Sequence, residues 1–153
     1  MLDRVLDFLT AREMPSVSPD AGELSLAVAA LLIEAARMDD EFGAAERAAI
    51  ERLLQAKFGL THDDVHALIG QAEEAVRRSS QLFPFTQKIC RALRPEERVP
   101  IIEMLWTVAY ADGVLDPHED MLVRRLAGLI HVPDRERALA RQRALAHIKT
   151  ALG

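Results

Sequence analysis

Two short acidic segments hold the residues best suited to chemistry in this chain of 153 residues. The first runs Asp39-Asp-Glu-Phe-Gly-Ala-Ala-Glu46, and the second runs Asp112-Gly-Val-Leu-Asp-Pro-His-Glu119. Each segment joins two stretches with helical apolar spacing, so a short turn can bring its acids to one place. Because carboxylate oxygens suit hard cations better than zinc, we expect bound Ca²⁺, Mg²⁺ or Mn²⁺. The candidate metal ligands are Asp39, Glu46, Asp112, Asp116 and Glu119.

The same acids also have a structural explanation, and the sequence leaves both open. Glu119 is the third helical residue after an Asp-Pro start, which is the position of the acid in a capping box. The helix dipole stabilises an acid in a first turn by about 0.3–1 kcal/mol without any ion. Asp39 follows a helix instead and faces the negative end of the dipole, where a cation would compensate. The alternatives are therefore a cation site and a pair of helix caps with a solvated acidic turn.

The two acidic segments occupy equivalent places in an internal repeat. A shift of 73 positions superposes Asp39 on Asp112 and Glu46 on Glu119, and it also matches apolar residues on both sides. Apolar matches alone are weak evidence, because any two amphipathic helices can be aligned, but the matched acids are harder to explain by chance. We predict two helix-loop-helix units, at about residues 24–58 and 97–131.

Helical spacing of apolar residues extends through nearly the whole chain, and alternation typical of a half-buried strand is absent. We therefore predict an all-α fold, a single compact domain over residues 1–153 with seven or eight helices. The first helix should carry Leu2, Val5, Leu6 and Leu9 on one face. The last should bury Ala138, Leu145, Ile148 and Leu152. Capping signals and breakers place the other helix starts near Pro19, Gly43, Thr61, Phe85, Pro95 and Asp116.

Charge and cysteine content indicate a cytoplasmic protein. The net charge is −5, which argues against a dedicated nucleic-acid binder. The charge is uneven, since residues 1–76 sum to −9 and residues 77–153 to +4. A single cysteine, Cys90, cannot form an internal disulfide. The longest uncharged run in a helical pattern, Leu24 to Ile33, is far shorter than the ~20 residues that span a bilayer.

Motifs for catalysis are weak, and we expect no catalytic residues. His62 and His66 have the spacing of a helical zinc motif, but Asp63 replaces its glutamate and no third ligand is recognisable. An EF-hand is not expected, because Val108 and Tyr110 stand where ligands are needed. Glycine-rich phosphate loops and serine elbows are missing. The arginines of the last helix lack interleaved aromatic residues for stacking on bases, so we expect no nucleic acid among the partners.

The paired segments Ala-Arg-Met-Asp39-Asp-Glu-Phe and Ala-Tyr-Ala-Asp112-Gly-Val-Leu-Asp-Pro-His-Glu119 resemble the TerB-like tellurite-resistance family, over about Leu24 to Ile130. The resemblance extends to the helical domain that precedes the J domain in some DnaJ-like co-chaperones. It implies a compact helical bundle, a cytoplasmic location, a role in stress responses, metal binding through the acids and no enzymatic activity. The partners are then expected to be other proteins. The alternative function is an ion-independent adaptor or a co-chaperone-like domain.

Overall fold

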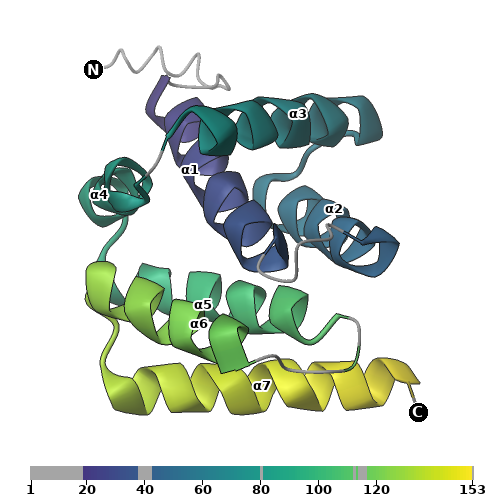
Figure 1. The fold of residues 1–153 in the computed structure, drawn as a ribbon, viewed down its shortest axis with the longest axis vertical. Helices are drawn as coiled ribbons and strands as arrows, with labels where there is room; N and C mark the ends of the chain where they lie inside the picture. Colours follow the sequence, from purple (N-terminus) through teal and green to yellow (C-terminus); the bar gives the residue numbers. More distant parts are fainter. Residues whose placement is uncertain (1–18, 38–42, 80, 112, 114–116, 153) are drawn as a thin grey trace, which may run out of the picture.

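Every regular element in the described part of the chain is an α-helix, which confirms the predicted all-α class (Figure 1). The computed structural model describes residues 19–37, 43–79, 81–111, 113 and 117–152. The helix expected at residues 2–9 lies outside these ranges. The elements are α1 (Pro19–Ala36), α2 (Ala44–Phe58), α3 (His62–Arg78), α4 (Phe83–Ala92), α5 (Pro95–Ala109), α6 (Pro117–Leu129) and α7 (Asp134–Leu152).

Local sequence signals explain the boundary between α2 and α3. Gly59 ends α2 with φ of 64°, in the left-handed region that glycine adopts without steric cost. The hydroxyl of Thr61 then accepts a hydrogen bond from the Asp64 amide at 3.1 Å and caps the start of α3. The helix start predicted near Thr61 is confirmed.

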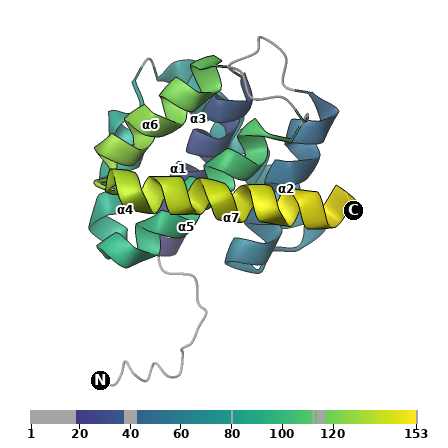
Figure 2. The ribbon, with the colours of Figure 1, turned by 90° about the horizontal axis from the view of Figure 1, so that it is seen from below.

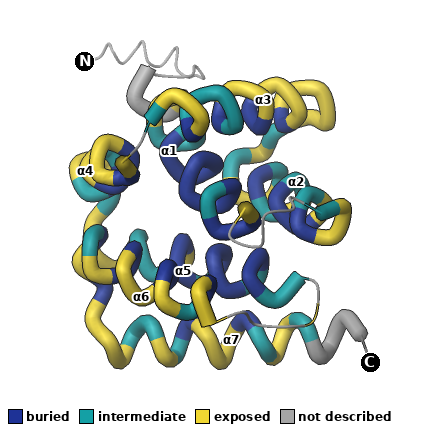
Figure 3. Tube along the Cα trace, viewed as in Figure 1, coloured by how far each residue is buried: buried dark blue, intermediate teal, exposed yellow. Residues whose placement is uncertain are grey.

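The core lies around α1 and α5, the two most enclosed helices (Figure 3). All residues from Ala27 to Ile33 are fully buried, so α1 is covered on every side. A helix that is apolar all round needs such surroundings, and this accounts for the uncharged run Leu24 to Ile33. On α5 the side chain of Trp106 is buried. None of the described helices is long and apolar enough to cross a membrane.

The predicted repeat is present and includes one more helix than expected. The last residues of α1 and α5, Ala36 and Ala109, are 73 positions apart, and so are the first residues of α2 and α6, Ala44 and Pro117. In both units the third helix packs mainly on the first, α3 on α1 and α7 on α5. Figure 1 shows α3 and α7 at opposite ends of the molecule, with α1 and α5 between them. Each unit is therefore a three-helix assembly, and α4 connects the two.

The buried face predicted for the last helix is wrong. Ala138 is exposed, and Leu145 and Ile148 are only half-buried, whereas Ala140 and Ala144 are fully buried. Figure 2 shows α7 crossing the outside of the bundle. Because α7 carries apolar side chains at almost every angular position, its packing on α5, rather than its own periodicity, decides which of them are buried.

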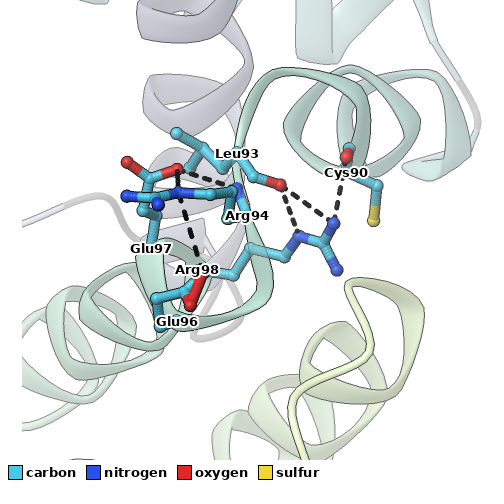
Figure 4. A network of polar contacts seen from close by, with 6 residues as sticks. All are labelled: Cys90, Leu93, Arg94, Glu96, Glu97 and Arg98. Carbon is cyan, nitrogen blue, oxygen red and sulfur yellow. Dashed lines mark hydrogen bonds and ion pairs between the residues drawn. The ribbon is translucent and has the colours of Figure 1, made fainter.

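Arg98 joins the ends of three helices (Figure 4). Its guanidinium donates to the carbonyl oxygens of Cys90 and Leu93, where α4 ends, and of Ile130, just after α6. These carbonyls lie where helical hydrogen bonding stops, so they need other donors. Beside it, Glu97 accepts a hydrogen bond from the Arg94 amide at 2.8 Å, and this bond lowers the pKa of the Glu97 carboxyl.

Candidate functional site

The acidic segments connect the first two helices of each unit, as the sequence predicted. The first lies between α1 and α2 and the second between α5 and α6. Asp39, Asp112 and Asp116 lie outside the described residues, so their positions stay predictions. Glu46 and Glu119 are described, each as the third residue of its helix.

Both glutamates are buried, which is unusual for this residue type. Glu46 is 9% exposed and Glu119 is 3% exposed. The Oε1 atom of Glu46 accepts a hydrogen bond from the Gly43 amide at 2.9 Å. A Cβ at position 43 would lie 2.6 Å from this oxygen, so a larger residue there would require the Glu46 carboxylate to shift. One oxygen of Glu46 therefore caps the start of α2, as the capping interpretation predicts. The residues between Glu46 and the end of the loop are only Gly43, Ala44 and Ala45.

The first turn of α2 and the turn after α5 border the same groove. Ala45 of α2 lines this groove together with Tyr110, Ala111 and Gly113, which follow the last turns of α5. Glu46 therefore directly follows a residue that lines the groove, and Gly113 of the second acidic segment lines the same groove. The structure places these parts of the two units close together, although no three His, Cys, Asp or Glu side chains among the described residues are arranged to hold a metal ion.

The groove has a volume of about 1020 Å³ and lies between α2, α5 and α7. Its walls are mainly apolar and include Leu53, Met104 and Ile148. A charged network is at its edge, where the Glu103 carboxylate contacts Arg143 at 3.1 Å and His147 at 3.5 Å. The groove is not apparent from the sequence, because it is formed by helices far apart in the chain. The local signal on α2 is a set of small side chains, Ala45, Ala49 and Ala56, which all line the groove.

An aromatic and cationic contact links the end of α5 to α7. Arg141 of α7 donates from Nε and Nη2 to the Tyr110 hydroxyl at 3.0 and 2.8 Å. Its guanidinium carbon also lies 5.5 Å from the centroid of the Trp106 ring, within the range of a cation–π interaction. Hydrogen bonds to Tyr110 and a cation–π contact to Trp106 therefore connect the end of α5 to α7.

The histidine pair lies elsewhere, at the contact between α2 and α3. The rings of His62 and His66 have centroids 4.4 Å apart, and Glu51 Oε2 is 3.0 Å from His66 Nε2. None of the three residues lines the groove. A hydrolytic zinc site would need the histidines beside the acidic turns, and the described residues give no support for that arrangement.

Most of the arginines in residues 77–153 contact groups within the protein. Arg98 and Arg141 bind the partners given above, and Arg143 pairs with Glu103. Others pair with acids a short distance along the chain. These pairs are Arg77 and Arg78 with Glu74, Arg94 with Glu96 and Glu97, and Arg137 with Asp134.

Comparison with known proteins gives one family and one fold. The family model described as tellurite resistance protein TerB matches residues 25–142. A crystal structure of a protein of unknown function from Porphyromonas gingivalis W83 is similar, with a TM-score of 0.59 and 20% sequence identity. The similarity covers 85% of this chain and 99% of that one. No curated protein matches the chain.

Proposed function

Because the chain belongs to the TerB tellurite-resistance family, we propose that it is a non-enzymatic, cytoplasmic module that binds a divalent cation at its acidic inter-helix turns. The cation is Ca²⁺, Mg²⁺ or Mn²⁺, and the partners of the module are other proteins of a stress response. The observation that carries the proposal is the equivalence of Glu46 and Glu119, two buried carboxylates at the same place in both repeat units.

The chemistry of a cation site follows from the residues around these glutamates. Hard cations take six or more oxygen ligands, and carboxylates supply one or two each. Asp112, Asp116 and Glu119 belong to one segment of eight residues, so they are near one another in the chain. Asp39 and Glu46 belong to the other, and the cap on Gly43 uses Oε1 of Glu46. A cation would relieve the repulsion between Asp39 and Asp112, which follow α1 and α5, and the negative ends of these helices.

Calorimetric titration of the full chain with Ca²⁺, Mg²⁺, Mn²⁺ and Zn²⁺ tests the proposal. We expect weak binding of a hard cation and its loss in the double variant Asp112→Asn, Glu119→Gln. The matched control is Asp63→Asn, Asp64→Asn, which removes two first-turn acids from α3, outside the repeat motif. Circular dichroism confirms that each variant is folded. The absence of heat with all four ions would refute cation binding.

An ion-independent adaptor, or a co-chaperone-like domain, is the second candidate function. It is favoured by the Glu46 cap, because this carboxylate has a structural role without any ion. Affinity capture of protein partners with and without a chelator separates the two functions. Capture that is unchanged by the chelator supports the adaptor, and capture that requires the ion supports the first proposal.

A further inference from the structure

The groove lies between the two units, and the repeat relates it to the place that α4 fills. There α4 packs beside α6, and the Cys90 thiol lies 3.7 Å from the carbonyl oxygen of Leu129. The apolar stripe of α6 consists of Leu122, Leu126 and Leu129. A shift of 73 positions superposes this stripe on Ala49, Leu53 and Ala56 of α2, and all three line the groove.

The α5 wall of the groove also has an equivalent in the other unit. Besides α6, α4 packs mainly on α1, and the repeat equates α1 with α5. On α5 the groove is lined by Pro100, Glu103, Met104 and Thr107, one face of the helix. The helices that hold α4 are α1 and α6. They correspond by the repeat to α5 and α2, which form the longer walls of the groove.

We propose that the groove is the docking site of residues 2–9 of this same chain, bound as a short helix. α4 directly precedes α5, and the segment that precedes α1 is residues 1–18, in which the apolar face at residues 2–9 lies seven positions, about two helical turns, before the place that the 73-residue shift gives for α4. The buried residues Leu82, Phe85 and Ile89 of the α4 region have the spacing i, i+3, i+7. The predicted apolar face at the start of the chain repeats this spacing in Leu2, Val5 and Leu9.

The dimensions of the groove and of the segment agree. Ala45 and Lys57 are the first and last residues of the α2 wall, and twelve helical rises extend ~18 Å. A helix over residues 1–10 fits within this length. The small alanine side chains allow the close approach that two packed helices need. The chain between Thr10 and Pro19 extends up to ~30 Å, about the diameter of a small domain.

Charge at the edge of the groove fits this occupant. Arg52 and Lys57 of α2 line the groove and are exposed, and neither forms an ion pair with a described residue. Asp3 and Asp7, one helical turn apart, flank one side of the apolar face at residues 2–9. The docked helix can direct these two acids toward the two cations. A segment of the same chain also has a high effective concentration, which favours it over a second copy.

Amide hydrogen exchange by NMR on the full chain tests the docking. We expect the amides of residues 4–9 to exchange at least about tenfold more slowly than an unstructured peptide. Ala56→Glu places a charge in the groove and should restore peptide-like exchange. Ala48→Glu is the matched control, because Ala48 is exposed on the same helix but does not line the groove. Peptide-like exchange in the unaltered chain, or equal exchange in both variants, would overturn the proposal.

Charge reversal separates this occupant from others. Arg52→Glu with Lys57→Glu should remove the protection, and adding Asp3→Lys with Asp7→Lys should restore at least half of it. Failure of the fourfold variant to recover would overturn the charge pairing. Protection that grows between ~20 μM and ~1 mM chain would assign the groove to the segment of a second copy, because a tethered segment docks independently of concentration. That result would also refute the proposal, and cation binding at the acidic turns is measured separately by calorimetry.

Discussion

Replacing Arg98 with alanine should destabilise the fold far more than replacing its neighbour Arg94. Arg98 makes four hydrogen bonds, of 2.9 to 3.3 Å, to three carbonyl oxygens at the ends of α4 and α6. Arg94 is 75% exposed and only forms ion pairs with neighbouring glutamates, at 3.4 and 3.8 Å. The two residues lie in the same part of the molecule, and Figure 4 shows both.

The expected magnitude follows from the hydrogen bonds that are lost. A hydrogen bond to a charged group contributes about 1.5–3 kcal/mol, but two of the four share the Leu93 carbonyl and the side chain is only partly buried. Water can replace part of the rest, so we expect Arg98→Ala to cost about 2–3 kcal/mol. Arg98→Lys keeps the charge but loses the planar fork, and should cost about half as much. An exposed ion pair contributes little, so Arg94→Ala should cost less than about 0.5 kcal/mol.

Urea unfolding, followed by Trp106 fluorescence and by far-ultraviolet circular dichroism, measures these costs. Trp106 is the single tryptophan and is buried, so its emission reports loss of the core. The slope of free energy against urea should not change among the variants, because all expose similar surface on unfolding. Equal costs for Arg98→Ala and Arg94→Ala would refute the reasoning. So would a lysine variant as stable as the unaltered chain, because a point charge would then be sufficient.

Two further predictions concern turns and caps. Gly59→Ala should destabilise by about 1 kcal/mol, because φ is 64° there, while Gly70→Ala in α3 should stabilise by about 0.5–1 kcal/mol, because alanine favours a helix and a Cβ meets nothing within 4 Å. Urea unfolding checks both signs, and a stabilising Gly59→Ala would contradict the turn geometry. NMR titration should place the pKa of Glu97 below the usual glutamate value, because the charged form accepts the Arg94 amide. Its contribution to stability is then fully present above the usual pKa and is lost as pH falls through the lowered one, whereas Glu97→Gln should abolish this dependence.

Helix boundaries were predictable because their signals are local. Gly59 and Thr61 act through their own backbone and hydroxyl groups, so their effect does not depend on the rest of the fold. The repeat was predictable because two pairs of acids, Asp39 with Asp112 and Glu46 with Glu119, have the same separation of 73 positions. The buried face of α7 was not predictable. Several faces of α7 are equally apolar, and packing on α5 decides that Ala140 and Ala144 are the buried residues.

The candidate site was predictable only in part. Equivalent positions for Glu46 and Glu119 follow from the 73-residue shift, and the structure adds that both side chains are buried. The use of Glu46 Oε1 as a cap on Gly43 requires the three-dimensional path of the segment. The groove beside the turns requires α2, α5 and α7 together, and periodicity within one helix carries no information about such an arrangement.

The residues that lead into the two acidic segments differ between the units, and this difference bears on where a cation would bind. Tyr110, at the start of the second turn, is fixed by Arg141, which also contacts Trp106. In the first unit the 73-residue shift puts Arg37 and Ile33 in place of these aromatic residues, so the same contact cannot form there. A turn that is already anchored loses less conformational entropy when its carboxylates converge on an ion. The second turn should therefore dominate cation affinity, which is why the test of cation binding alters Asp112 and Glu119.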